Sequence, residues 1–222
     1  MPPAPCRPRH PAITYDDPVT TSSYRPVVLR GGVVIEDPVT VVVAIMARWR
    51  LDVSGPACPV SFGEPDLRLA NRGGARISAA QIAAVLERRR AIEQALAAIA
   101  PQASLAAAAG AVPWQPLRQL FDAFAGIRGV GFAKMTKALH PKRQALIPLL
   151  DSIVQKYLEG EDPGAQAGFA ERALGLVRGY KRDLDRNGAA LLAARRELAA
   201  RQYELTEVRI LDLLILSAEA AA

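Results

Sequence analysis

Aromatic residues are scarce in this chain of 222 residues, at 5% of the sequence, although half of all residues are hydrophobic. Alanine and leucine dominate the apolar content. Sandwiches and barrels depend on strands rich in aromatic and β-branched residues, so this composition favours packed helices instead. The length suffices for one domain with a substantial hydrophobic core.

Cysteine is almost absent, since only Cys6 and Cys58 occur in the chain. Neither has a second cysteine or a histidine at the spacing of a metal site. This argues against a structural zinc site and against a cysteine-ligated cluster, and we expect no metal and no other cofactor. Two cysteines without a secretion signal indicate reduced thiols and a cytoplasmic location.

Long apolar runs are also missing. No stretch of about 18 uncharged apolar residues exists, so we expect no membrane-spanning helix and no membrane partner. Residues 1–10 carry charge but lack the apolar core of a signal peptide. Residues 1–26 are rich in proline, serine and threonine, which predicts a flexible lead-in. We expect residues 27–222 to form a single, mainly helical domain.

Acidic residues are nearly missing from one segment of a basic chain. The net charge is +6, and between Leu117 and Leu150 six cations accompany a single acid, Asp122. The six cations are Arg118, Arg128, Lys134, Lys137, Lys142 and Arg143. A basic patch of this kind attracts polyanions and binds them in a salt-dependent way. Taken alone, such a run also fits a solvated helical face.

The N-terminal third has weaker signals. The segment Arg25–Glu36 has short apolar stretches on both sides of Gly31-Gly32, which predicts a small β-hairpin with a glycine turn. Asp37 followed by proline is typical of a helix start and predicts a helix over Asp37–Trp49. The β-branched run Thr40–Val43 favours a strand over the same residues, so both alternatives remain. Prolines and glycines across Gly55–Gly74 predict a loop-rich linker.

Apolar residues recur at helical spacing from Ser78 onward. Ser78 is placed to cap a helix that runs to about Ala100 and carries the arginines 88–90 on a solvated face or against phosphate. Further helices are expected over residues 117–124 and 132–139, from Ile147, and over residues 169–184, 188–200 and 205–217. The predicted fold class is therefore mainly α, with a small β-hairpin near the N-terminus.

The most informative segment is Ile127–Lys134, in which a Gly-Val-Gly turn joins two apolar helices. The two glycines allow a backbone geometry that a β-carbon would forbid. The helix after the turn points its N-terminal amides back toward it, which creates an anion site. Two lysines spaced by three residues share the next helical face. The predicted contacts to a nucleic-acid backbone are Arg128, Gly129, Val130, Gly131, Lys134 and Lys137. The alternative is an ordinary helical corner in which glycines relieve crowding.

A few other polar residues stand in apolar surroundings. Arg209 and Asp212 lie three residues apart in the final helix, where an internal ion pair or a bond to neighbouring backbone avoids a lone buried charge. Contact with a partner is the alternative for both. His140 precedes a proline at the end of the helix after the turn, where it caps that helix or contacts phosphate.

The sequence Ile127-Arg-Gly-Val-Gly131 resembles the leucine-proline-glycine-valine-glycine hairpin of the helix-hairpin-helix DNA glycosylase superfamily, over roughly residues 117–158. The resemblance implies a helix-hairpin-helix module, duplex DNA as partner, and an essential aspartate about twenty residues beyond the second glycine. Asp151 stands at that position. In a monofunctional glycosylase its carboxylate would stabilise positive charge developing on the sugar and orient the attacking water. Without catalysis, Asp151 complements the first turn of its helix or bonds the hairpin from behind.

The chain also departs from that superfamily. Members that cleave the DNA strand have a Schiff-base lysine two positions after the second glycine, where this chain has Ala133, so lyase chemistry is not expected. Lys134 lies about 100° further around the helix and is a poor substitute. The four-cysteine cluster of some members is absent, and so is a clear aromatic set for a flipped base, since Trp114 is the only tryptophan near the hairpin.

Three functions remain open from the sequence. The first is a DNA-binding helix-hairpin-helix protein that acts as a monofunctional base-excision enzyme through Asp151. The second is a non-catalytic DNA-binding or accessory protein, and the third is a structural helical domain that binds an acidic protein partner. Residues 139–151 and 208–212 are also similar to an uncharacterised bacterial family with the same hairpin-to-aspartate arrangement. That likeness supports the fold and implies no activity.

Overall fold

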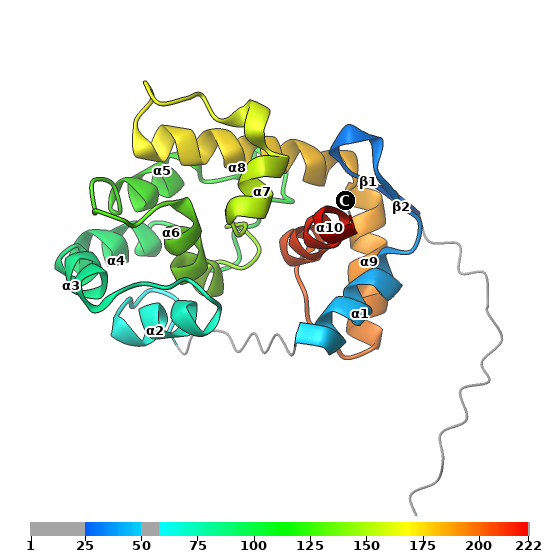
Figure 1. Cartoon of the computed structure of the whole chain (residues 1–222), viewed down its shortest axis with the longest axis horizontal. Coiled ribbons are helices and arrows are strands. Elements are labelled where there is room, and N and C mark those ends of the chain that lie inside the picture. The colour runs from blue at the N-terminus through cyan, green and yellow to red at the C-terminus, as the bar shows by residue number, and fades with distance from the viewer. Residues whose placement is uncertain (1–24, 50–57, 222) are drawn as a thin grey trace, which may run out of the picture.

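The computed structural model describes residues 25–49 and 58–221. Within these residues the chain forms ten α-helices, four short 3-10 helices and one antiparallel pair of strands (Figure 1). The α-helices are α1 (Pro38–Trp49), α2 (Glu64–Arg72), α3 (Ala79–Glu87), α4 (Arg89–Ala97), α5 (Trp114–Asp122), α6 (Phe132–Leu139), α7 (Ser152–Tyr157), α8 (Phe169–Arg186), α9 (Gly188–Ala200) and α10 (Glu207–Ala221). The strands are β1 (Val27–Val28) and β2 (Val34–Ile35), and the 3-10 helices are η1 (Arg30–Gly32), η2 (Ala109–Ala111), η3 (His140–Lys142) and η4 (Glu159–Glu161). The predicted mainly helical fold with a small β-hairpin is confirmed, whereas the expected lead-in lies outside the described residues except for its last two.

The described N-terminal segment packs on the C-terminal helices. β1 and β2 pair antiparallel across a turn in which Gly31 and Gly32 have positive φ angles. Asp37 caps α1 as predicted, because its Oδ1 accepts the Thr40 amide at 2.9 Å. α1 lies against α9 and α10 at one side of the molecule (Figure 1). The strand alternative for Thr40–Val43 is therefore wrong, since the cap and the apolar packing place this run in a helix.

The loop-rich linker expected over Gly55–Gly74 is wrong for its second half, which forms α2, whereas residues 55–57 lie outside the described residues. Gly63 precedes the helix, and its amide donates to the Asp66 carboxylate at 2.9 Å. Pro65 stands in the first turn, where an amide would have no partner within the helix. Leu67 is completely buried and anchors the helix in the core. The helix was not predicted because the glycines and prolines around it indicate a loop.

The helix expected from Ser78 to Ala100 consists of two helices, α3 and α4. Ser78 caps α3 as predicted, because its hydroxyl accepts the Gln81 amide at 3.3 Å. Arg88 leaves the helical conformation, with φ −94° and ψ 4°, and separates the two helices. The arginines 88–90 are exposed, which fits both the solvated face and the contact with phosphate.

α8 connects the two sides of the molecule. It runs along one edge of the structure, above α5 at one end and beside β1 at the other (Figure 1). Gly175 in α8 allows η4 to lie directly on the helix, since a β-carbon there would come within 2.6 Å of the Glu161 carbonyl oxygen. The helices predicted over residues 169–184, 188–200 and 205–217 correspond to α8, α9 and α10. Across residues 25–49 and 58–221, no helix combines the length and the apolar content needed to cross a lipid bilayer.

Candidate nucleic-acid interface

The hairpin between α5 and α6 has the geometry expected of a tight helical corner. The Val130 amide donates to the Ile127 carbonyl at 3.0 Å and closes the turn. Gly129 adopts φ +75°, which only glycine accommodates without strain. Ile127 and Val130 are buried and anchor the turn, whereas Arg128, Gly129 and Gly131 are exposed. The turn therefore presents its backbone and one cation to solvent.

The N-terminus of α6 faces outward from this turn. Gly131 is its N-cap residue and, having no side chain, supplies no cap to the first amides of the helix. Phe132 fixes the start of the helix, because its ring is buried 4.9 Å from the ring of Phe169. Helix N-termini with open amides carry partial positive charge and bind anions. The corner thus combines a rigid apolar base with an exposed anion-attracting tip.

The two predicted lysines lie on the face of α6 that meets α2 and α3. The Lys134 ammonium donates to the Gln81 Oε1 atom at 2.8 Å, and the side-chain Nε2 atom of Gln81 donates to the Arg128 carbonyl at 3.4 Å. Lys137 extends toward Gly74, where a β-carbon would stand 3.8 Å from its Nζ atom. Gln81 is neutral, so it positions Lys134 without cancelling its charge. Sequence reasoning missed Gln81 as part of this site, although its spacing from Ser78 is that of a capping box.

The basic surface is smaller than the sequence indicated, because two of the six cations are structural. Lys142 has a side chain only 2% exposed and pairs with Asp66 at 2.7 Å. Arg143 is 1% exposed. Its guanidinium donates to four backbone carbonyls at 2.7–2.8 Å, those of Pro59, Leu96, Ile99 and Lys142. Arg118 is exposed but lies near two carboxylates, at 4.0 Å from Asp122 and 3.9 Å from Glu171. Within the described residues, the cations of the hairpin region without a carboxylate partner are therefore Arg128, which is exposed, and Lys134 and Lys137, which are half-buried.

Asp151 is the N-cap residue of α7. Its Oδ1 atom accepts the amides of Ile153 and Val154 at 3.0 and 3.1 Å, and the residue is half-buried. The neighbouring Leu150 amide donates to the Thr136 hydroxyl of α6 at 3.0 Å. The structure thus brings Asp151 to the middle of the helix that the hairpin opens. The predicted place near a helix start is confirmed, although α7 begins at Ser152 rather than near Ile147.

Residues 66–219 match the model of DUF6308, a family of unknown function. This range is more than half of the 222 residues, and it includes the hairpin and Asp151. The chain belongs to this family. No curated protein and no solved structure matches the DUF6308 chain. The likeness to the helix-hairpin-helix glycosylase superfamily therefore remains a prediction, and the activity of this DUF6308 protein has to be argued from its site.

A buried polar group supports the segment before Asp151. The expected ion pair between Arg209 and Asp212 is wrong for the described residues. The Asp212 carboxyl instead accepts the Leu149 amide at 3.4 Å and contacts the Tyr180 hydroxyl at 3.0 Å, so the backbone alternative is confirmed for it. Burial raises the pKa of Asp212 from 3.8 to about 7.

His140 is the C-cap residue of α6, which was the first of the two alternatives predicted for it. Its ring is buried, with Nδ1 2.6 Å from the Ile147 carbonyl oxygen, so contact with phosphate is wrong. Burial lowers the pKa of His140 to about 4. This side chain is therefore neutral at physiological pH and belongs to the core.

Two further residues bear on glycosylase chemistry, Ala133 and Trp114. Ala133 is half-buried in the first turn of α6 and offers no amine. Trp114 packs under Arg178, whose guanidinium carbon lies 5.6 Å from the ring centroid.

Within the described residues, no group of three or more histidine, cysteine, aspartate or glutamate side chains is placed to hold a metal ion.

Proposed function

We propose that this DUF6308 protein binds duplex DNA through the sugar–phosphate backbone at the α5–α6 hairpin. The observation that carries the proposal is the uncapped N-terminus of α6, which directly follows the Gly-Val-Gly turn. Arg128, Lys134 and Lys137 surround this turn, and residues 123–150 contain no aspartate or glutamate. Phosphate oxygens suit both partners, because they accept hydrogen bonds from open amides and pair with cations.

The small number of cations indicates binding that is weak and independent of the DNA sequence. Contacts to the backbone position a protein on DNA and carry no sequence information. Binding through phosphates alone is typically weak, with a Kd of about 10⁻⁴–10⁻⁶ M at physiological salt, and falls steeply as salt rises. We therefore expect sequence-independent binding that is measured most readily at low ionic strength.

Charge reversal at the hairpin tests the proposal. Fluorescence anisotropy of a labelled duplex gives the Kd at several salt concentrations for the wild type and for Lys134→Glu with Lys137→Glu. Each phosphate contact contributes about 0.9 to the slope of log affinity against log salt, so the double variant should lose about 2 from the slope. Its affinity at low salt should fall at least tenfold, on the order of 1 kcal/mol for each lost contact.

The matched control carries the same charge change on the opposite side of the molecule. Arg48 in α1 and Arg196 in α9 are both exposed, and both helices lie away from the hairpin (Figure 1). Arg48→Glu with Arg196→Glu should retain most of the wild-type affinity and slope. If the wild type has no affinity for duplex DNA even at low salt, the proposal is wrong, and an acidic protein partner becomes the better explanation of the basic surface.

Base excision by Asp151 is a second candidate, favoured by one observation. The carboxylate is half-buried at the start of α7, and its Oδ1 atom alone accepts the two capping amides. The other oxygen is thereby available to a developing positive charge on a sugar. Because asparagine is also a good N-cap, Asp151→Asn preserves the helix while removing the charge.

The corresponding assay measures base release from duplexes that carry an alkylated, a deaminated or an oxidised base. Base excision by Asp151 predicts abasic sites with the wild type and none with Asp151→Asn, while both proteins bind DNA equally. Release from none of these duplexes would leave DNA binding without catalysis. Equal release by both proteins would show that Asp151 is not the catalytic carboxylate.

A further inference from the structure

We infer that the end of α2 and the turn between α2 and α3, residues 72–78, form a second part of the DNA-contact surface, in which Arg72 and Arg76 hold phosphates adjacent to those at the hairpin. This inference rests on the proposed function, because it enlarges the same binding site. It concerns residues that are separated from the hairpin by about fifty positions in the sequence.

The turn lies directly against the hairpin region. Gly74, in the middle of the turn, is next to the ammonium group of Lys137, since a β-carbon at Gly74 would stand 3.8 Å from that nitrogen. Gln81 in the first turn of α3 contacts the Lys134 ammonium at 2.8 Å and the Arg128 carbonyl at 3.4 Å. α2 and α6 also pack against each other. The two corners therefore form one continuous surface.

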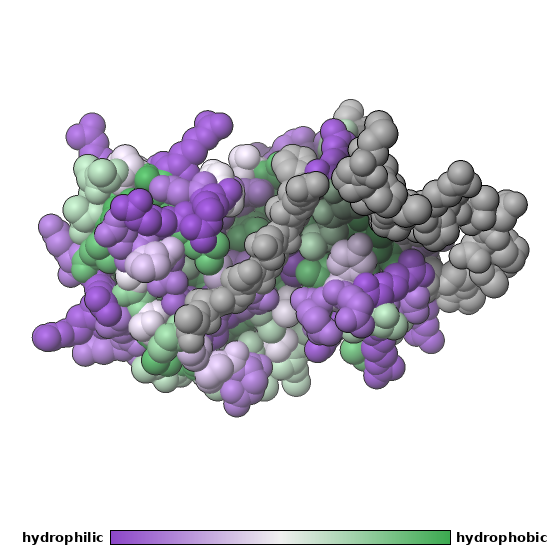
Figure 2. Space-filling view, turned by 90° about the horizontal axis from the view of Figure 1, so that it is seen from below, coloured by the Kyte–Doolittle hydropathy of each residue, from purple (hydrophilic) through white to green (hydrophobic). Residues whose placement is uncertain are grey.

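The charge of this turn matches that of the hairpin. Arg72 and Arg76 are exposed, and neither forms an ion pair with another residue in the part of the chain that the structure describes. Residues 67–86 contain no aspartate or glutamate. Hydrophilic side chains project from the surface where α2 and α3 lie (Figure 2). With Arg128, Lys134 and Lys137, the two arginines make a surface of five cations.

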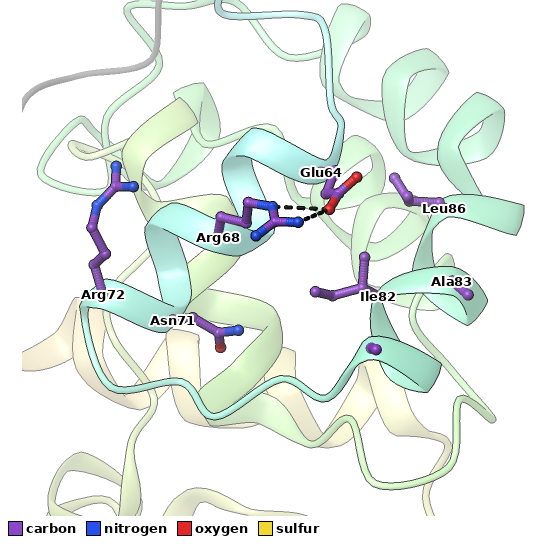
Figure 3. A pocket seen from close by; sticks show the side chains of 8 residues that line it. Glu64, Arg68, Asn71, Arg72, Ile82, Ala83 and Leu86 are labelled. Carbon is purple, nitrogen blue, oxygen red and sulfur yellow. Dashed lines mark hydrogen bonds and ion pairs between the residues drawn. The ribbon is translucent and has the colours of Figure 1, made fainter.

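Arg68 does not belong to this set, although it is close in the sequence. Its Nε atom donates to the Glu64 carboxylate at 2.9 Å, so its charge is compensated. A groove between α2 and α3 contains this pair, and Arg72 also lines it, with a side chain that points away from Arg68 and Glu64 (Figure 3). The lining residues are Glu64, Arg68, Asn71, Arg72, Ala79, Ile82, Ala83 and Leu86.

The backbone of the turn is fixed, and it holds an arginine in an unusual conformation. Asn71 accepts the Ile77 amide at 2.6 Å and donates to the Ile77 carbonyl at 2.9 Å. Arg76, directly before Ile77 in the chain, has φ +54°, a region that glycine and asparagine occupy more easily. Within the described residues, no ion pair offsets this conformation, and we attribute the arginine at this position to the binding of an anion.

The test uses the full chain and the same labelled duplex. Arg72→Glu with Arg76→Glu should weaken binding about tenfold at low salt and lower the salt slope by about 2, as for two lost phosphate contacts. Arg72→Gln with Arg76→Asn removes the charges and suits the positive φ, so it should show the same change in slope with a smaller loss of affinity. The control is again Arg48→Glu with Arg196→Glu.

The outcomes separate this inference from the proposed function. If the hairpin variant loses affinity while both arginine variants match the control, the hairpin binds DNA and the second turn does not, which overturns this inference alone. If the wild type does not bind duplex DNA, the proposed function fails first. A loss with Arg72→Glu and Arg76→Glu comparable to that of the hairpin variant, together with a smaller loss but the same change in slope for Arg72→Gln with Arg76→Asn, supports a surface built from both corners.

Discussion

The protonation of Asp212 gives the most detailed prediction. The Tyr180 hydroxyl lies 2.7 Å from the Val208 carbonyl oxygen and 3.0 Å from Oδ1 of Asp212. A hydroxyl has one proton, and a carbonyl can only accept. If Tyr180 donates to Val208, the contact with Asp212 needs a proton on the carboxyl. Burial favours the same state, because it raises the pKa of Asp212 from 3.8 to about 7.

Asp212→Asn reproduces this neutral group. Its amide can donate to the tyrosine hydroxyl, and its carbonyl can accept the Leu149 amide. In the wild type, the Asp212 carboxyl loses its proton above pH 3.8 in the unfolded chain, whereas in the folded protein it keeps this proton until about pH 7. Stability from this group is therefore complete below pH 3.8 and is lost as the pH rises to 7. At 1.36 kcal/mol for each pH unit, the loss is on the order of 4 kcal/mol. The Asp212→Asn variant has no titrating carboxyl at this position and should therefore avoid this loss of stability.

Urea unfolding of both proteins between pH 4 and pH 8 measures the effect. The variant should equal the wild type near pH 4 and exceed it by about 4 kcal/mol near pH 8. His140 acts in the opposite direction, because its lowered pKa of about 4 makes the fold lose stability as the pH falls below 6.5. This contribution is common to both proteins and cancels in their difference. A difference that stays constant with pH, or a less stable variant at pH 8, would refute the reasoning.

Three further predictions concern the residues that hold the site in place. Arg143→Met should destabilise the protein by about 3 kcal/mol or more in chemical unfolding, because it leaves buried carbonyls without a donor. Thr136→Val should cost about 1–3 kcal/mol in the same assay, since it removes the acceptor of the buried Leu150 amide. Gly175→Ala should lower the Tm, because its β-carbon would lie 2.6 Å from a carbonyl oxygen of η4, whereas Gly188→Ala has no neighbour within 4 Å and should leave the Tm unchanged or raise it. A Tm raised equally by both alanines would contradict the close packing of η4 on α8.

Local signals in the sequence were sufficient for much of the fold. Asp37 and Ser78 cap helices at the predicted positions, because capping depends on residues three positions apart. The apolar repeat of residues 117–124 likewise predicted α5, whose Leu117, Leu120 and Phe121 are completely buried. The hairpin and its glycines followed from the same short-range reasoning.

Contacts between distant residues could not be predicted in this way. Lys142 and Arg143 counted as surface charge in the sequence, yet each donates to a carbonyl 84 positions earlier in the chain. Gln81 joined the site for the same reason, since 53 positions separate it from Lys134. Charge counting identifies how many cations a segment has, and only the packed structure decides which of them reach solvent.

The most direct test of the central claim is a titration of ¹⁵N-labelled protein with duplex DNA at low salt, observed through the backbone amide signals. Binding at the hairpin predicts that the largest shifts occur at Gly129, Gly131 and Phe132, and that the Arg48 and Arg196 amides remain unchanged. Added salt should reverse these shifts, as for phosphate contacts. Shifts confined to α1 and α9, or no shift at any DNA concentration, would contradict the claim that this corner binds DNA.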